Sequence, residues 1–313
     1  MQDNLNYFKY SRDNPEPPLD EYYVFAELDP KLEVFAEKTK KIKEVLTAIK
    51  VAFDNNQPQD SIERLFKILQ GTIQQNSNRS EFLCFANACD TVLDVLKDEE
   101  NSWLLKEITK LYLEKRNIVD ITPKEWVQAL CDSQASKKKG KAGEKKLINL
   151  CRKSDCPLVA KWEHFKQYKQ AVAKFSKSKI NLNIIRDNLG VRFEARNQEK
   201  LPDLLIKKDD KWIIVEAKHQ TVGGGTQNHK ITELTDLLSM SQTDSSVKFV
   251  AFLDGNYSNF LLKLADKQIE KKEPITEDNK YAAQQRDIVR LLHQNHNNYW
   301  LNTAGFIKFI DEI

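Results

Sequence analysis

The carboxylates of Asp203 and Glu216 and the ammonium group of Lys218 lie within one short segment, KLPDLLIKKDDKWIIVEAKH. Two oxygen ligands together with bound waters suit Mg²⁺, a hard cation that keeps much of its hydration shell. Such an ion would lower the pKa of a water molecule and offset charge on a phosphoryl oxygen, while Lys218 orients or deprotonates the attacking water. The alternative is a surface turn with incidental charges, because Asp, Glu and Lys are common residues.

A β-hairpin is expected to bring these three side chains together. Apolar runs predict strands over 204–206 and 212–217, joined by a turn at 207–211. Side chains alternate across a strand, so Glu216 and Lys218 point to the same face. The antiparallel return places the aspartate beside them at one edge of the sheet. Charged groups at the end of such a buried strand are costly, which favours a function for them.

The order Pro202-Asp203 followed by Glu216-Ala217-Lys218 resembles the signature of the PD-(D/E)xK nuclease superfamily. The resemblance implies a restriction-endonuclease-like core, an α/β (α+β) fold with a central mixed sheet flanked by helices, and Asp203 and Glu216 as Mg²⁺ ligands. In that superfamily a helix before the sheet often carries another acid that helps to bind metal, and Glu144 occupies that place. Alternatively, Glu144 is a first-turn residue favoured by the helix dipole.

A closer resemblance, to the EcoRI-type restriction endonucleases, covers residues 200–260. EAKHQ (216–220) is followed by NHKITELTDLLS (228–239) and then by VKFVAFLDGNYSNF (247–260), in the order in which that family has a strand, a helix and a strand ending in an acidic-Gly turn. The resemblance implies a type II restriction endonuclease that cuts double-stranded DNA and leaves 5′-phosphate ends. A homodimer would match a two-fold symmetric target, and a DNA methyltransferase would be the protecting partner.

A glycine-rich turn before the expected helix is a candidate for DNA recognition. Glycines that lead into a helix leave N–H groups exposed at its positive end, which suits a phosphate. Gln, Asn and Lys side chains there can pair with base edges in the major groove. The residues expected to contact DNA in this segment are Gly224, Gly225, Thr226, Gln227, Asn228, His229 and Lys230. The alternative is a flexible loop followed by a polar helix cap.

A basic cluster gives a second expected contact with DNA, although the net charge of the chain is only +3. The cluster consists of Lys137, Lys138, Lys139 and Lys141. Lysines that neutralise phosphates drive binding through the release of counterions. The alternative is a solvated helix face.

The apolar pattern divides the chain into two domains. Spacings of three and four residues from 30 to about 132 predict an N-terminal α-helical domain over 1–135, in which 1–30 is an irregular arm. A small basic loop at 133–144 is the expected boundary, and the nuclease domain is expected over 136–313. In that domain, helices are predicted over 144–151, 162–175, 232–240, 259–270 and 282–293, and further strands over 182–185, 191–195 and 247–253.

Composition excludes several other classes of protein. With 40% hydrophobic and 30% charged residues, the chain lacks the stretch of about 18 apolar residues that a membrane helix needs, so no membrane partner is expected. The polar, proline-rich N-terminus does not resemble a signal peptide, which favours a cytoplasmic location. The five cysteines lack zinc-ligand spacing and are expected to be reduced thiols. Two functional alternatives remain open: a structure-specific repair or recombination nuclease, and a DNA-binding module with an inactive nuclease core.

Overall fold

The computed structural model describes residues 4–24, 27–74, 80–119, 122–133, 136–191, 201–222, 228–240, 245–264 and 280–313. Its internal contacts divide the chain into a helical unit, Phe25–Ser136, and an α/β unit made of Met1–Val24 and Lys137–Ile313. The boundary after Ser136 lies one residue from the predicted boundary between residues 135 and 136. The N-terminal segment, however, belongs to the α/β unit and not to the helical one, and its first part is a helix, α1 (Asn4–Asp13), instead of an irregular arm. The reason is that α1 buries Tyr7 and Phe8 in the hydrophobic cores of the α/β unit.

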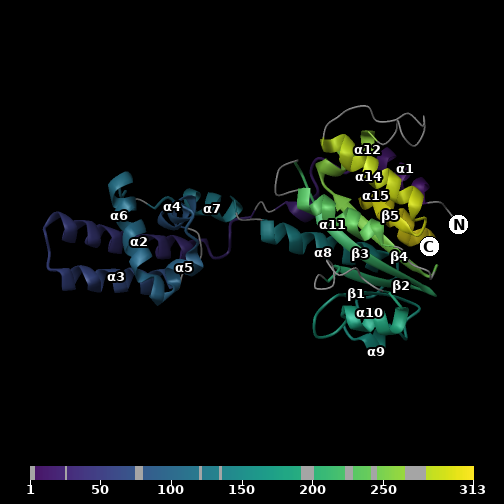
Figure 1. Cartoon of the computed structure of the whole chain (residues 1–313), viewed down its shortest axis with the longest axis horizontal. Helices are drawn as coiled ribbons and strands as arrows, with labels where there is room; N and C mark the ends of the chain where they lie inside the picture. Colours follow the sequence, from purple (N-terminus) through teal and green to yellow (C-terminus); the bar gives the residue numbers. More distant parts are fainter. Residues whose placement is uncertain are drawn as a thin grey trace. The chain divides into compact units, whose positions relative to one another are not determined.

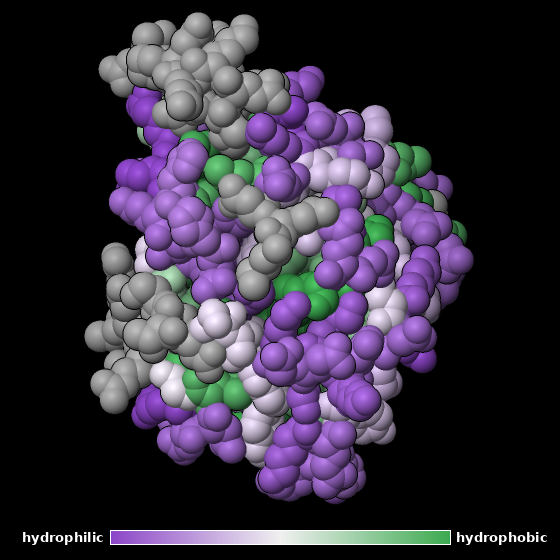
Figure 2. Space-filling view, turned by 90° about the vertical axis from the view of Figure 1, so that its right-hand side faces the viewer, coloured by the Kyte–Doolittle hydropathy of each residue, from purple (hydrophilic) through white to green (hydrophobic). Residues whose placement is uncertain are grey.

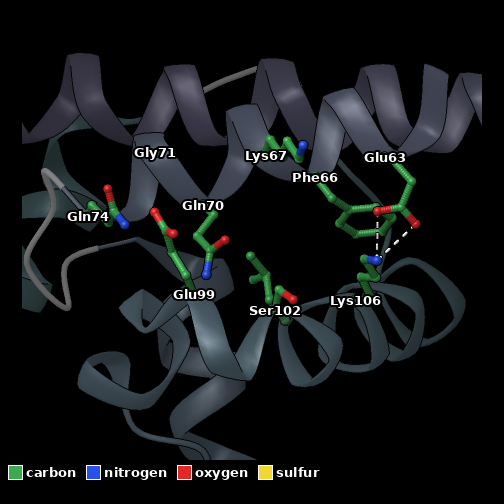
Figure 3. Close-up of a pocket in the computed structure, with 10 residues that line it drawn as sticks. Glu63, Phe66, Lys67, Gln70, Gly71, Gln74, Glu99, Ser102 and Lys106 are labelled. Atoms are coloured by element: carbon green, nitrogen blue, oxygen red, sulfur yellow. Dashed lines mark hydrogen bonds and ion pairs between the residues drawn. The ribbon is translucent and has the colours of Figure 1, made fainter. Parts of the chain in front are cut away.

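The helical unit is built from helices, as predicted. They are α2 (Leu32–Asp54), α3 (Gln59–Gln74), α4 (Glu81–Ala88), α5 (Leu93–Lys97), the 3₁₀ turn η2 (Glu99–Asn101), α6 (Ser102–Lys115) and α7 (Lys124–Ser133). Ile42, Leu46 and Ile49 recur along one face of α2 and are buried in a single core with the facing helices. A cavity of about 470 Å³ opens between α3 and α6, where Glu63 and Lys106 form an ion pair at 2.7 Å (Figure 3).

A five-stranded mixed sheet forms the centre of the α/β unit (Figure 1). The strands, in spatial as well as chain order, are β1 (Gln170–Lys174), β2 (Leu204–Lys208), β3 (Lys211–His219), β4 (Val247–Asp254) and β5 (Asn298–Leu301). The pairs β1–β2 and β2–β3 are antiparallel, whereas β3–β4 and β4–β5 are parallel. A mixed α/β fold with a central sheet, as predicted, is therefore confirmed.

Helices cover both faces of this sheet, because its strands are apolar on both sides. One face, with Val215 and Phe252, packs against α1, α8 (Ser136–Lys153) and α15 (Thr303–Glu312). On the other face, α9 (Trp162–Phe165) and α10 (Leu182–Leu189) cover the β1–β3 side, near the lower edge of the sheet in Figure 1. The β4–β5 side of that face packs against α11 (Asn228–Ser239), α12 (Asn256–Leu264) and α14 (Lys280–Gln294).

Several predicted elements of this unit are wrong. The predicted strand at 182–185 is part of α10, which Asn181 caps by accepting from the Ile184 N–H and which Gly190 ends in a left-handed conformation. The predicted helix 162–175 is instead α9 followed by β1, since an apolar run as short as Ala-Val-Ala does not distinguish the two states by periodicity. The predicted loop 133–144 lies largely in α8, and β5 was not predicted. The strand predicted at 191–195 lies, apart from its first residue, outside the described residues.

Figure 2 shows one face of the molecule, on which hydrophilic residues predominate and hydrophobic side chains form small separate patches. Among the helices that the structure describes, none is both long enough and apolar enough to cross a membrane.

Candidate active site

The hairpin of β2 and β3 brings the predicted acidic pair close together. Leu204 pairs with Val215 in the antiparallel register, and the Asp203 N–H donates to the carbonyl of the same Val215 at 3.0 Å, so the regular ladder ends at Leu204. Asp203 lies at this end of the ladder, close enough to Glu216 for the two charges to interact. Asp209, in the tight turn, has a φ of 53°, a left-handed conformation that Asp tolerates better than most residues. The short turn keeps the two strands in this register.

The three predicted catalytic side chains lie together at the end of this hairpin. The Ala217 N–H donates to Asp203 Oδ2 at 2.7 Å, and the Lys218 ammonium group forms an ion pair with Glu216. Lys218 Nζ also lies 3.1 Å from Oε2 of Glu233, which projects from α11. The structure thus adds Glu233 to the group, a residue that the sequence placed only within a helix.

Burial and mutual repulsion perturb the titration of this group. Burial, and next the negative charge of Glu216, raise the pKa of Asp203 to about 6, although Lys218 and the Ala217 N–H oppose the shift. Burial alone would lower the pKa of Lys218, but the neighbouring carboxylates of Glu216, Asp203 and Glu233 raise it above its ordinary value. Lys218 therefore carries its proton at neutral pH, whereas Asp203 ionises only at a cost.

Glu144 lies near the acidic pair but on another side of the sheet. Its carboxylate, on α8, accepts from Lys174 Nζ at 2.8 Å, and Lys174 pairs with Leu204 on the face opposite to Glu216 and Lys218. Its charge still contributes to the raised pKa of Asp203. Within the described ranges, no three or more His, Cys, Asp or Glu side chains form a group arranged to hold a metal ion. Asp203 and Glu216 remain the predicted metal ligands, and a role for Glu144 stays a prediction.

The predicted DNA-contacting residues are only partly described. Lys139 and Lys141 lie on α8, at least partly exposed, whereas the side chains of Lys137 and Lys138 lie outside the described ones. Lys230 Nζ donates to the His219 carbonyl at 2.9 Å. Burial and the positive charges of Lys218 and Lys139 lower the pKa of Lys230, which shows that three lysines lie close to one another here.

Still fewer residues of the glycine-rich turn are described. Gly224, Gly225, Thr226 and Gln227 lie outside the described residues, and Asn228 is described only as the first residue of α11. His229 is exposed in the first turn of that helix. Base recognition by this segment therefore stays a prediction.

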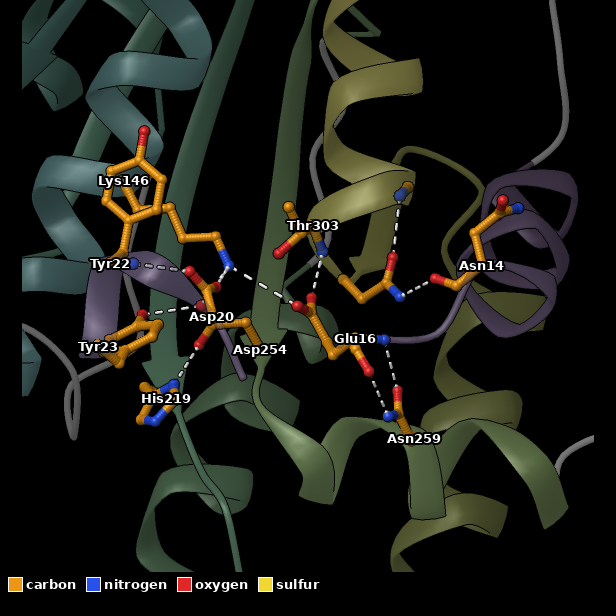
Figure 4. Close-up of polar contacts among 12 residues, drawn as sticks. Asn14, Glu16, Asp20, Tyr22, Tyr23, Lys146, His219, Asp254, Asn259 and Thr303 are labelled. Atoms are coloured by element: carbon orange, nitrogen blue, oxygen red, sulfur yellow. Dashed lines mark hydrogen bonds and ion pairs between the residues drawn. The ribbon is translucent and has the colours of Figure 1, made fainter. Parts of the chain in front are cut away.

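A buried charge network, which the sequence did not indicate, lies beside this site (Figure 4). Its centre is Lys146 of α8, whose Nζ lies 2.6 Å from Asp20 Oδ2, 2.9 Å from Asp254 Oδ2 and 3.7 Å from Glu16 Oε2. The side chains of Lys146, Asp254 and Glu16 are 3%, 0% and 1% exposed. Burial raises the pKa of Glu16. In Asp254 the burial effect is outweighed by His219 and Lys146, which together lower its pKa.

His219 links this network to the end of β3. Its Nδ1 lies 2.9 Å from Asp254 Oδ1, and its ring stacks on Tyr23 with centroids 3.7 Å apart. The Tyr23 hydroxyl donates to Asp254 Oδ2 at 2.8 Å. His219 thus packs on the face opposite to Lys218. The Asp254-Gly255 pair ends β4 in the predicted turn, but the burial of Asp254 was not foreseen, because its partners Asp20 and Lys146 are far away in the sequence.

Comparisons of the chain with protein-family models, with curated proteins and with solved structures found no match.

Proposed function

We propose that the protein is a Mg²⁺-dependent type II restriction endonuclease in which Asp203, Glu216 and Lys218 are the catalytic residues. The observation that carries this proposal is the close placement of Asp203, Glu216 and Lys218 at the end of the hairpin. Such a group costs folding free energy, because burial and repulsion disfavour the ionised form of Asp203. A fold retains a costly arrangement of this kind most readily where catalysis uses it.

The donor set fits a hard divalent cation. Asp203 and Glu216 would hold it, and its charge would offset the repulsion that raises the pKa of Asp203 to about 6. When bound, the ion supplies an activated water and stabilises negative charge on a phosphoryl oxygen. Lys218, which carries its proton, donates hydrogen bonds that orient the water or the phosphate and does not act as the base. Glu233 holds the Lys218 ammonium group in place.

The surrounding fold agrees with a restriction-endonuclease-like core and with DNA as the substrate. A mixed sheet with helices on both faces carries the hairpin, and β3, α11 and β4 follow one another in the order that the EcoRI-type resemblance implies. The positive charges of Lys139 and Lys218 act on Lys230, and such a group of lysines suits a phosphate backbone. A homodimer on a symmetric site and a methyltransferase of the same specificity belong to the same proposal.

Cleavage of supercoiled plasmid by the full chain in Mg²⁺ tests the proposal. Asp203→Ala, Glu216→Ala and Lys218→Ala should each lower the rate at least about 100-fold, because each removes a metal ligand or the group that orients the water. The matched control is Asp210→Ala, an exposed carboxylate in the turn of the same hairpin, which should leave the rate unchanged. Binding of DNA in Ca²⁺ should survive the Lys218 change.

The products separate this proposal from its alternatives. Discrete fragments from DNA of random sequence support a restriction enzyme, whereas a smear, or cutting only at branched DNA, indicates a structure-specific nuclease. No cleavage by the wild-type chain in Mg²⁺ or Mn²⁺, together with retained DNA binding, would indicate an inactive binding module. If base recognition lies at the start of α11, Gln227→Ala and Asn228→Ala should reduce discrimination between sites by a factor of about 5 to 150.

A further inference from the structure

The residue that follows the proposed catalytic lysine is held from several directions. His219 bonds to Asp254 through its ring nitrogen, stacks on Tyr23, and accepts at its carbonyl from Lys230. One residue further on, the Gln220 N–H donates to the Asp254 carbonyl at 3.0 Å, which continues the parallel ladder of β3 and β4. The backbone beside Lys218 therefore has contacts on both sides of the strand.

The segment that leads to Tyr23 is itself anchored at two points. Tyr23 closes the 3₁₀ turn η1 (Glu21–Tyr23), which Asp20 caps by accepting from the Tyr22 N–H at 2.9 Å. Asp20 in turn pairs with Lys146 at 2.6 Å.

The other anchor lies four residues earlier in the chain (Figure 4). The backbone of Glu16 exchanges two hydrogen bonds with the Asn259 side chain, at 2.8 and 2.9 Å. Its carboxylate accepts from the Thr303 N–H at 2.6 Å. Tyr23 is thus presented to His219 by a segment that is fixed to α8, α12 and α15.

We propose that Tyr23, His219 and Asp254 form a clamp that positions Lys218. The clamp acts through the backbone: it fixes the residue next to Lys218, and so fixes the point from which the long, flexible lysine side chain reaches the reacting groups. A catalytic group needs such support, since a displacement of about 1 Å can lower a rate about 100-fold. The effect on catalysis rests on the proposed function, whereas the clamp itself does not.

Substitutions at Tyr23 separate this role from a general contribution to stability. Tyr23→Ala removes both the stack and the hydrogen bond to Asp254, whereas Tyr23→Phe removes the hydrogen bond alone. Tyr22→Ala is the matched control, because Tyr22 lies in the same turn and contributes its backbone N–H to Asp20. Under single-turnover conditions with saturating enzyme, we expect the cleavage rate to fall about 10- to 100-fold in Tyr23→Ala, less in Tyr23→Phe, and not at all in Tyr22→Ala. The Kd for DNA in Ca²⁺ should change less than about twofold in all three, as expected for a positioning role.

Amide hydrogen exchange tests the clamp without any activity. The amides of 216–220 should exchange faster in Tyr23→Ala than in the wild type, while those in the middle of β4 and in α3 keep their protection. Equal exchange at 216–220 in Tyr23→Ala, Tyr22→Ala and the wild type would overturn the proposal. If the wild-type chain cuts no DNA, the proposed function fails and the exchange comparison alone decides the clamp.

A conservative substitution covers the case in which Tyr23→Ala does not fold. His219→Asn keeps a donor for Asp254, and His219→Ala does not. A smaller loss of rate and protection in His219→Asn than in His219→Ala supports the clamp, because Asn keeps the bond to Asp254 although it lacks the ring that stacks on Tyr23. The same values in both variants would count against it.

Discussion

Removing the ammonium group at the centre of the buried network should strongly destabilise the α/β unit. Lys146→Met keeps most of the side-chain volume but removes the cation that three carboxylates share. In the wild type, Lys146 Nζ lies 2.6 to 3.7 Å from an oxygen of each carboxylate. Breaking a buried ion pair from one side costs about 3–5 kcal/mol, since the remaining charge stays desolvated. For a unit of about 200 residues this corresponds to a decrease in Tm of roughly 6–20 °C.

Denaturant unfolding followed by tryptophan fluorescence measures this effect. Trp103 and Trp126 of the helical unit are exposed and can be replaced by Phe, so that the signal comes from the α/β unit. The control is Lys145→Met, the preceding residue on α8, which is exposed and should change the free energy of unfolding by less than about 0.5 kcal/mol.

The pH dependence gives an independent check. Asp254 has a lowered pKa in the folded state, so its stabilising contribution is present above its unfolded pKa and is lost as the pH falls through the folded value. Without Lys146 the pKa values of Asp254 and Glu16 should rise, and acid should then relieve the repulsion. The destabilisation by Lys146→Met should therefore be larger at pH 7.5 than at pH 5. If Lys146→Met lowers the free energy of unfolding no more than Lys145→Met does, and by the same amount at both pH values, the reasoning is refuted.

Three further predictions concern the site and its support. Asp203→Asn should raise the free energy of unfolding of the metal-free protein at pH 7.5, because a pKa of about 6 makes the ionised aspartate unfavourable in the folded state. In denaturant titrations this gain should shrink as the pH falls from about 6 to about 4 and should vanish once both states are protonated. Gly255→Ala should lower the same free energy by at least about 1–2 kcal/mol, since φ is +85° and a Cβ would lie 2.6 Å from the Gln220 carbonyl oxygen. Gly71→Ala, in open space on α3, should instead raise it by about 0.5–1 kcal/mol, and a loss there would contradict the argument. Replacing Lys139 and Lys141 together with Ala should weaken DNA binding equally on all sequences and reduce the slope of log K against log salt by about 2; an unchanged slope would identify a solvated helix face.

The sequence alone predicted the hairpin that carries the candidate site. Its strands are continuous apolar runs, its turn is polar, and the partners Asp203 and Glu216 are only 13 residues apart, so local rules suffice. The helices of the helical unit were predictable for the same reason, because three- and four-residue spacing of apolar side chains is a local signal. These elements agree with the structure in type, with shifted boundaries.

Other parts were decided by tertiary structure. The residues of β1 become a strand because the edge of β2 offers hydrogen-bond partners, and α1 joins the α/β unit because that unit buries Tyr7 and Phe8. The network around Lys146 joins α8 to Asp20 and to Asp254, separated from it by 126 and 108 residues. No local pattern marks such partners, because each is an ordinary charged residue until folding removes water from all of them at once. What the sequence determined was therefore the position of the acidic pair and Lys218, and what only the tertiary structure decided was the set of buried charges and stacked rings that holds them.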